Sequence, residues 1–375
     1  MRLNLNLDDT QCEVCKDILI VRFSQPFKAL SSAVLNSGLF KTRAIINRHV
    51  PKNYEHDDSA NLLINVIKEM NLPKETVGFL TAVDVQKLSF VTDKIDELTV
   101  SAIVTAGLGY PAAAGDDVKT LKKIGTINTI ILIDKNLTEG CMVNCIQTAV
   151  EAKTIALREL DIRSHFSNTI ASGSTSDAII VACKEMGEPI KYAGTATELG
   201  MMIGQNVKKA TKRAIQNYDK TMPERSIINR LSERGIEIDD MVNAGLELFM
   251  PTHILQSKDK VSELLRDELI KTLSDVNISA LILAALRLQE DGENGLIPGL
   301  PKENFIKDPI FLVADESIGS AIANYISGTW GFYNFLYFER KKPGLIKKLG
   351  PFLDDAIGGL IAGSLSDIYT KNREK

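Results

Sequence analysis

The pattern of residues along the chain changes near residue 220. Before it, short runs rich in β-branched residues alternate with segments of helical spacing, and after it helical segments follow one another almost without interruption. Strands and helices bury their apolar faces in different layer arrangements, so the two parts need separate cores. We therefore predict an α+β (mixed α/β) domain over residues 1–220 and an all-α helical domain over residues 221–375. A length of 375 residues suits two domains.

The expected elements can be placed by their spacing and by the turn residues between them. In the first domain we predict strands at 18–23, 44–47, 77–83, 99–105, 126–134 and 178–183. Helices are predicted there at 60–70, 139–160 and 196–218, with Thr138 as the cap of the second. In the second domain we predict helices at 227–235, 239–249, 258–273, 277–290, 311–325 and 353–369.

Composition excludes several classes of function. The formal charge of −4 argues against nucleic-acid binding as the main activity. The longest uncharged run, residues 317–338, contains Asn, Ser, Thr and Gly, which predicts a buried helix with a turn and no stable membrane insertion. The N-terminal residues lack the apolar core of a signal peptide, so we expect a cytoplasmic protein. The four histidines form no zinc-binding motif, and we predict no cofactor for the first domain.

Three polar strand ends in the first domain are candidates for chemistry. One strand ends at Asp84, a second runs through Thr105 into Gly107, and the segment 172–177 contains Ser174 and Asp177. Gly-rich polar strand ends leave backbone N–H groups free to hold an anion or an oxyanion. The alternative is that these are ordinary turns with locally bonded hydroxyl groups.

A polar helix face supplies two further candidates, Asn144 and Glu151. Asn144, Thr148 and Glu151 follow one another at helical spacing, so they share a face of the helix predicted at 139–160. Amide and hydroxyl groups around one carboxylate suit a pocket for a polar substrate. An exposed polar face is the alternative. From their chemistry, the candidate catalytic residues are Asp84, Thr105, Asn144, Glu151, Ser174 and Asp177.

The order of segments in the first domain resembles the adenosylcobinamide amidohydrolase family (CbiZ type). The matching segments are 31–38, 44–54, 77–85, 100–109, 125–134, 141–157, 171–183 and 192–204. The resemblance implies hydrolysis of the amide that links aminopropanol to the corrinoid, with adenosylcobinamide as substrate and adenosylcobyric acid as product.

Two acidic doublets stand out in the second domain. Asp315-Glu316 and Asp354-Asp355 both lie in apolar helical sequence, where adjacent carboxylates are costly unless they are paired or bind a cation. Together they would offer the oxygen ligands that Mg²⁺ prefers, and nearby glycines (319, 358, 359 and 363) would let two helices approach. The alternative is that these acids only interact with helix N-termini.

A basic segment separates the two doublets. Arg340 and Lys342 lie in the sequence FERKKPG, which we expect to form a loop. A cationic loop beside a bound metal ion is suited to a phosphate ester. Solvated surface charge is the alternative.

The second domain resembles the phosphatidylglycerophosphatase A family, and more closely its archaeal α-ribazole-phosphate phosphatase branch (CobZ type). The resemblance rests on the patterns ADESIG and LDDAIGG and on the KPG turn between them. It implies Mg²⁺ or a similar divalent cation at Asp315, Glu316, Asp354 and Asp355, and α-ribazole 5′-phosphate as substrate. With both domains in one chain, the sequence resembles bifunctional enzymes (CbiS type) of cobalamin (vitamin B12) salvage and biosynthesis. The alternatives are a non-catalytic corrinoid-binding protein and a lipid phosphatase. The oligomeric state is not predicted.

Overall fold

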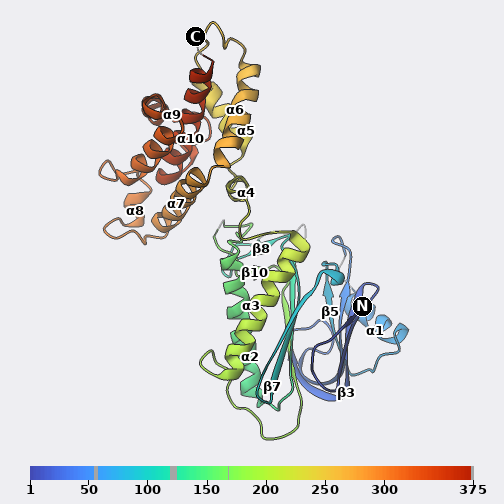
Figure 1. The fold of residues 1–375 in the computed structure, drawn as a ribbon. Coiled ribbons are helices and arrows are strands. Elements are labelled where there is room, and N and C mark those ends of the chain that lie inside the picture. The colour runs from blue at the N-terminus through green and yellow to red at the C-terminus, as the bar shows by residue number, and fades with distance from the viewer. Residues whose placement is uncertain (55–57, 119–124, 168, 373–375) are drawn as a thin grey trace. The chain divides into compact units, whose positions relative to one another are not determined.

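The computed structural model describes residues 1–54, 58–118, 125–167 and 169–372. The chain divides into two compact units, Met1–Pro223 and Glu224–Lys375 (Figure 1). The first combines a curled sheet with helices and the second is helical, as predicted. Each unit is described below by itself.

A nine-stranded sheet forms the centre of the N-terminal unit. Its order is β1-β2-β3-β11-β9-β7-β6, with β4 paired to β3 and β5 paired to β4. The pairs β4–β5 and β9–β11 are parallel and the others are antiparallel. The strands are β1 (Arg2–Leu3), β2 (Thr10–Cys15), β3 (Ile18–Ser31), β4 (Gly38–His49), β5 (Thr76–Thr81), β6 (Ser89–Ile95), β7 (Leu98–Gly107), β9 (Thr126–Ile133) and β11 (Ala178–Cys183); β8 (Pro111–Ala112) and β10 (Gly173–Ser174) form a separate small pair.

The long strand β3 makes the sheet curl into two limbs. It pairs with β2 through residues 18–23 and with β11 through residues 28–31, while β4 follows its other side. The register with β4 shifts between Arg22 and Phe27, which is where a bulge bends a strand and increases its twist. One limb therefore contains β3, β4 and β5, and the other contains β11, β9, β7 and β6 (Figure 1).

Three apolar layers follow from this curl. The inner faces of the two limbs pack on one another, with Phe79 of β5 and Ile130 of β9 in one cluster. Helices α2 (Glu139–Glu159) and α3 (Glu198–Asp219) cover the outer face of the β9 limb. Helix α1 (Ser59–Glu69) covers the outer face of the β4 limb through Leu63. Thr138 caps α2 as predicted, because its hydroxyl accepts a hydrogen bond from the Cys141 amide at 3.1 Å.

The C-terminal unit is built around a helix that is buried along most of its length. Helix α10 (Pro351–Lys371) packs against α9 (Ala314–Lys341), α7 (Val276–Glu293), α6 (Lys258–Leu273) and α5 (Ile238–Glu247). Shorter elements complete the unit: α4 (Ile227–Ser232), α8 (Lys302–Phe305) and the 3₁₀ turn η3 (Ile346–Lys348). Among the described residues no single helix is long and apolar enough to cross a membrane, whereas α6 and α7 taken together reach that length but are bent by 85°.

Helix α9 differs from the prediction. We expected a helix at 311–325 and a loop at 338–344, but α9 runs from Ala314 to Lys341 with a break at Ser327 and Gly328. Gly328 has φ 57° and ψ −146°, a conformation that essentially only glycine adopts, so the chain turns there and resumes the helix. The turn predicted within residues 317–338 is therefore present, but the prediction missed that the chain is helical again after it, up to Lys341. Arg340 consequently lies in the last helical turn, and Lys342 is its left-handed cap.

Glycines bring α9 and α10 into backbone contact. A Cβ atom on Gly359 would clash with the carbonyl oxygen of Gly319, and one on Gly319 would lie 2.6 Å from the Asp355 carbonyl oxygen. Gly363 is similarly tight against Ile326, whereas Gly358 has space for a methyl group. The predicted close approach is therefore confirmed for three of the four glycines.

Candidate functional site

A cavity of 240 Å³ opens between the two limbs of the N-terminal sheet. Its walls come from the ends of β4 and β5, the start of β9 and the residues before β11. Apolar side chains line much of it, together with a few polar groups; the lining residues are Ser32, Val34, Val50, Pro51, Lys52, Tyr54, Phe79, Leu80, Thr81, Ala82, Thr126, Asn128, Ser176, Asp177 and Ala178. Such a lining is typical of a small-molecule site.

Buried amides join the two limbs behind this cavity. Asn47 of β4 donates to the Thr105 hydroxyl of β7 at 2.9 Å. Asn128 of β9 donates to the Asn47 carbonyl oxygen at 3.0 Å and to the Leu80 backbone oxygen at 2.8 Å. Asn128 is 1% exposed, and its own Oδ1 is buried without a hydrogen-bond donor among the described residues. A buried acceptor left without a donor is costly, so this oxygen is a candidate for ligand contact.

Two hydroxyl groups lie on the polar side of the cavity. The oxygens of Thr126 and Ser176 are 2.9 Å apart, and the Ser176 hydroxyl donates to the Gly125 carbonyl oxygen at 2.8 Å. Since Ser176 uses its proton on Gly125, the Thr126 hydroxyl donates to Ser176. In neither of these two hydrogen bonds does the Thr126 oxygen act as an acceptor.

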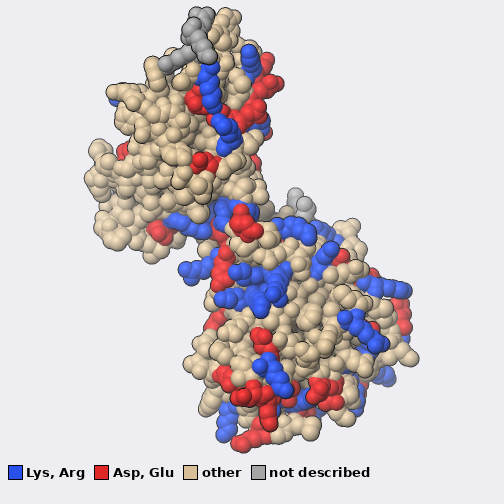
Figure 2. Space-filling view, viewed as in Figure 1, with Lys and Arg blue, Asp and Glu red and all other residues tan. Residues whose placement is uncertain are grey.

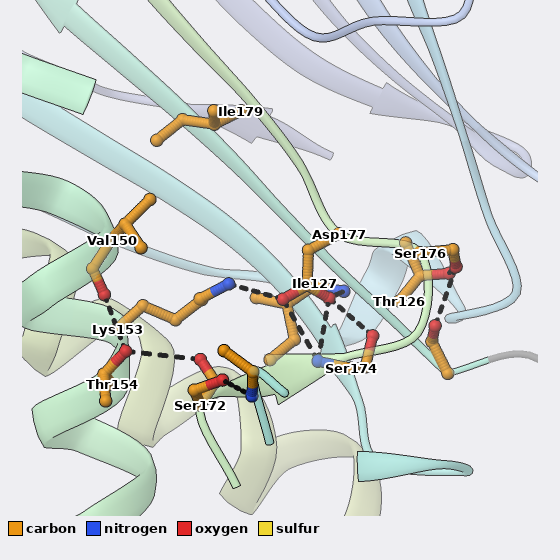
Figure 3. Close-up of polar contacts among 12 residues, drawn as sticks. Thr126, Ile127, Val150, Lys153, Thr154, Ser172, Ser174, Ser176, Asp177 and Ile179 are labelled. Carbon is orange, nitrogen blue, oxygen red and sulfur yellow. Dashed lines mark hydrogen bonds and ion pairs between the residues drawn. The ribbon is translucent and has the colours of Figure 1, made fainter. Parts of the chain in front are cut away.

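Asp177 is the centre of a dense set of polar contacts (Figure 3). Its Oδ1 accepts hydrogen bonds from the Ile127 amide at 3.0 Å and from the Ser174 hydroxyl at 2.5 Å. Its Oδ2 accepts from the Ser174 amide at 3.1 Å and pairs with the Lys153 ammonium of α2 at 2.5 Å. The ion pair is largely buried, with side-chain exposures of 12% for Lys153 and 17% for Asp177. Asp177 therefore fixes the segment before β11 against both β9 and α2.

Glycine is required beside this ion pair. A Cβ atom on Gly173 would clash with the Asp177 carboxylate and lie 2.9 Å from the Lys153 nitrogen. The Gly-Ser-Thr-Ser-Asp sequence is thus explained locally: glycine leaves space for the pair, and the hydroxyl of Ser174 satisfies the carboxylate.

The structure brings together some of the predicted residues. Ser174 and Asp177 are hydrogen-bonded to one another, and Thr105 belongs to the amide network behind the cavity. Asp84 instead caps the 3₁₀ turn η2 (Val85–Lys87), since its Oδ1 accepts from the Gln86 amide at 2.9 Å. It does not contribute to the described lining of the cavity.

The predicted residues on the polar face of α2 also lie outside the described lining of the cavity. Thr148 is buried and donates to the Ala193 carbonyl oxygen at 2.9 Å, so it joins α2 to the chain before α3. Glu151 is exposed and borders a shallow depression of 230 Å³ between α2 and α3, and Asn144 is half-buried on the same helix. Neither Asn144 nor Glu151 contributes to the described lining of the cavity.

The C-terminal unit contains a cluster of five carboxyl groups between α9 and α10. These residues form two sets, and within each set the possible ligand atoms all lie within 4.8 Å of one another. One set is Asp315, Glu316 and Asp355, and the other is Glu339, Asp354 and Asp355. The four predicted ligands are thus brought together. Glu339 was missed, because in the sequence it stands next to basic residues. Asp355 belongs to both sets.

The raised pKa values and the unpaired oxygens of this cluster favour binding of a cation. Burial, with the neighbouring Glu316, raises the pKa of Asp315 to about 8, and burial with Glu339 raises the pKa of Asp355 to about 10. Burial also raises the pKa of Asp354 to about 7, despite the opposing effect of Lys342. Oxygens of Glu316, Glu339, Asp354 and Asp355 are buried without hydrogen-bond donors among the described residues. Unpaired carboxylate oxygens at this spacing fit a divalent cation such as Mg²⁺.

The ammonium group of Lys342 lies beside the carboxylate cluster. Its ammonium lies 2.6 Å from Asp354, 3.2 Å from Asp308 and 3.3 Å from Glu339. Burial disfavours the ammonium, but these ion pairs outweigh it and raise the pKa of Lys342 well above its usual range. Arg340, the other predicted phosphate-binding residue, is exposed.

A second cavity, of 400 Å³, adjoins the cluster. Asp354 belongs to both, and Lys342, which pairs with Asp354, also lines the cavity. Lys347 and Lys348 of η3 add positive charge to its wall, and Gln289 and Ile306 line other sides. An opening that combines lysines with cation-binding carboxylates is chemically suited to a phosphate ester.

Two further acidic residues of this unit, Asp275 and Glu290, have structural partners. Asp275 caps α7 by accepting from the amides of Asn277 and Ile278, and it also accepts from the Tyr325 hydroxyl. Glu290 pairs with Arg234 and Arg287.

Comparison with known proteins identifies related sequences for both units. The family model described as adenosylcobinamide amidohydrolase matches residues 4–223, and the model described as phosphatidylglycerophosphatase A matches residues 263–369. An adenosylcobinamide amidohydrolase of Methanosarcina mazei is 30% identical over 199 residues, which are 51% of this chain and 90% of that protein. An uncharacterized protein of Methanocaldococcus jannaschii is 39% identical over 132 residues, which are 34% of this chain and 99% of that protein.

Among solved structures, the low temperature requirement C protein of Listeria monocytogenes is similar to part of the chain. It is 25% identical with a TM-score of 0.35, and the match covers 40% of this chain and 95% of that one.

Proposed function

The chain belongs to the adenosylcobinamide amidohydrolase family, and from this premise we propose that its N-terminal unit hydrolyses the amide between aminopropanol and the corrinoid of adenosylcobinamide. The protein is a cobamide-related hydrolase, and adenosylcobinamide is the substrate that the family supports. The products of this step would be adenosylcobyric acid and 1-amino-2-propanol.

The observation that carries the N-terminal proposal is the cavity beside Asp177. In amide hydrolysis the oxygen of water bonds to the acyl carbon, the carbon–nitrogen bond breaks, and the leaving nitrogen gains a proton. Asp177 is the only carboxylate in the described lining, and Lys52 is the only ammonium group there. We assign Asp177 to the acid–base part of the reaction, together with Ser174 and Lys153, and Lys52 to stabilising the charge that develops on the acyl oxygen.

We further propose that the C-terminal unit is a phosphatase that requires a divalent cation, with α-ribazole 5′-phosphate as substrate. The observation that carries this proposal is the cluster of unpaired carboxylate oxygens beside a cavity lined by lysines. Asp315, Glu316, Glu339, Asp354 and Asp355 would hold Mg²⁺. When bound, Mg²⁺ would neutralise the charge of the phosphate and orient water.

The residues around the ion would place the substrate. Lys342 holds Asp354 through an ion pair at 2.6 Å, which fixes one oxygen of that carboxylate and leaves the other available. Lys347 and Lys348 line the neighbouring cavity and would bind phosphate oxygens. A corrinoid amidohydrolase unit in the same chain favours a substrate from the assembly of the same kind of molecule.

A lipid phosphate remains a second candidate because of one surface feature. The segment 306–313, which leads into Asp315, exposes large apolar side chains: Ile306 is 64% exposed, Ile310 99% and Phe311 70%. Figure 2 shows that the helical unit presents a broad surface with few charged side chains in this view. An apolar segment beside a phosphatase site is suited to acyl chains.

One set of assays tests both activities and both phosphate substrates. Purified full-length protein is incubated separately with adenosylcobinamide, with α-ribazole 5′-phosphate and with phosphatidylglycerophosphate in vesicles, and the products are identified by mass spectrometry. We expect adenosylcobyric acid from the first and α-ribazole from the second. Excess EDTA should stop the phosphatase reaction and leave amide hydrolysis intact. Release of phosphate from the lipid alone would favour the second candidate, and tight binding of adenosylcobinamide without product would show a binding protein.

A further inference from the structure

The N-terminal cavity is much smaller than the substrate of the proposed reaction. At 240 Å³ it lies below the usual range of sites that enclose a whole drug-sized ligand. A corrin ring is therefore excluded, and only a short side chain of the corrinoid can enter. We propose that the cavity takes the aminopropanol arm, with the amide N–H of that arm donating to Asn128 Oδ1, while the ring stays outside. This inference rests on the proposed amidohydrolase function.

The hydrogen bonds of the Asn128 amide group fix its orientation and show that the atom without a partner is an acceptor. Its Nδ2 donates to the Asn47 oxygen at 3.0 Å and to the Leu80 carbonyl oxygen at 2.8 Å. A flipped amide would place its oxygen against the Leu80 carbonyl, which cannot donate, so the orientation is fixed. Oδ1 is consequently an acceptor that has no donor among the described residues. The N–H of a secondary amide supplies the missing donor.

The rest of the cavity matches the other groups of the arm. The arm carries one hydroxyl and one methyl group on the same carbon. Thr126 has lone pairs free to accept from that hydroxyl, because its own proton is used on Ser176. Val50, Phe79 and Ala178 provide apolar contact for the methyl group. Few polar groups in a mostly apolar cavity provide orientation, which suits an enzyme that must select one amide among several on a corrinoid.

The inference can be tested from the ligand side, so that no variant has to fold. The probe is N-(2-hydroxypropyl)acetamide, which reproduces the arm and its amide. Saturation-transfer NMR on the full-length protein should detect binding, and adenosylcobinamide should displace the probe. The N-methyl analogue lacks the donor and should bind at least about tenfold more weakly. N-propylacetamide lacks the hydroxyl and should also bind more weakly. Equal binding of all three compounds, or no binding of the probe, would overturn the proposal.

A matched pair of variants tests the position of the arm. Val34 lines the cavity and is 48% exposed, so Val34→Trp should fold and block the opening. Val143 is 56% exposed on α2 and lies outside the described lining, so Val143→Trp is the control. We expect Val34→Trp to lose probe binding and at least about tenfold in the kcat/KM for adenosylcobinamide, and Val143→Trp to match wild type. Normal binding and turnover in Val34→Trp would remove the arm from this cavity.

The two tests separate this inference from the proposed function. If wild type hydrolyses adenosylcobinamide but neither the probe nor Val34→Trp shows an effect, the function stands and the cavity is wrong. If the probe binds through its N–H and hydroxyl but no hydrolysis occurs, the cavity stands and the catalytic proposal fails.

Discussion

Asp177 combines a structural role with the chemistry proposed for it. Its carboxylate accepts from two backbone amides and one hydroxyl, and it is the partner of the buried ammonium of Lys153. Removing one member of a buried ion pair leaves the other charge without compensation. A loss of activity in a variant of Asp177 must therefore be compared with its stability.

We predict that Asp177→Asn lowers the rate of amide hydrolysis at least about 10²-fold, the lower range for a group in acid–base catalysis. Asp84→Asn and Glu151→Gln are the matched variants, because the sequence suggested catalytic roles for both and the cavity contains neither. They should lose much less activity than Asp177→Asn. Rates with adenosylcobinamide and thermal unfolding midpoints are measured for all three. A folded Asp177→Asn protein with normal rates, or an equal loss in the other two, would move the site away from the cavity.

Asp355 belongs to both sets of carboxylates in the C-terminal unit, so it bears on how many cations are held there. Two sets that share one residue predict two Mg²⁺ ions per chain. Asp355→Asn should weaken binding at both sites, whereas Asp315→Asn should affect one. Glu268→Gln is the control, because Glu268 pairs with Lys271 and Lys371 and belongs to neither set. Isothermal titration calorimetry gives the stoichiometry. A single site that survives Asp355→Asn would contradict the shared-ligand arrangement.

Sequence analysis could identify a site residue when its chemical type is unusual in the local sequence around it. The doublets at 315 and 354 could be predicted because adjacent carboxylates are rare in apolar helices. Glu339 and Asn128 could not, because each has an ordinary local context: Glu339 stands among basic residues and Asn128 in a β-branched strand. Only the pairing of distant elements shows that the oxygen of Asn128 lacks a donor and that Glu339 faces Asp355.

At the scale of elements, local patterns predicted where strands and helices lie better than where they end. The six predicted strands are present, but β3 continues to Ser31 and β4 begins at Gly38, because both extend along the curl of the sheet. The edge strand β6 was missed, since its sequence SFVTDKI is partly polar and reads as a loop. Helix α9 passes through Gly328 because its packing against α10 continues on both sides of the break.

The contact between α9 and α10 gives a prediction at this scale. Gly359→Ala would place a methyl group against the Gly319 carbonyl oxygen, so the helices must separate, at a cost of about 1–3 kcal/mol. Gly358→Ala is the matched control, because its nearest neighbour would be 3.8 Å away and alanine favours a helix by up to about 1 kcal/mol. Chemical denaturation of both variants measures the difference. Equal stabilities would show that the helices are not held at this distance.

At the scale of the whole molecule, the division into two units suggests that each folds independently. Clusters of buried apolar residues lie within one unit or the other: buried residues between Ile227 and Ile368 form one cluster, and the remaining three clusters lie between Leu5 and Ile215. We predict that residues 1–223 and 224–375, expressed separately, are each soluble and unfold cooperatively. Circular dichroism during heating tests this. If both pieces unfold without cooperativity while the full chain unfolds cooperatively, the stabilities of the two units depend on one another.

The same division predicts where a metal ion stabilises the protein. A ligand that binds only the folded state raises the free energy of unfolding, by about 2.7 kcal/mol at a concentration of 100 Kd. The carboxylate cluster lies wholly in the C-terminal unit, where burial, together with the neighbouring acids, raises the pKa values of Asp315 and Asp355 and so disfavours their charged forms when no cation is bound. Mg²⁺ should therefore raise the unfolding midpoint of residues 224–375 by roughly 5–10 °C and leave that of residues 1–223 unchanged. Asp355→Asn in the C-terminal piece should abolish the shift, and Glu268→Gln should retain it. A shift of similar size in the N-terminal piece would place a metal ion in the amidohydrolase unit, where the sequence predicts none.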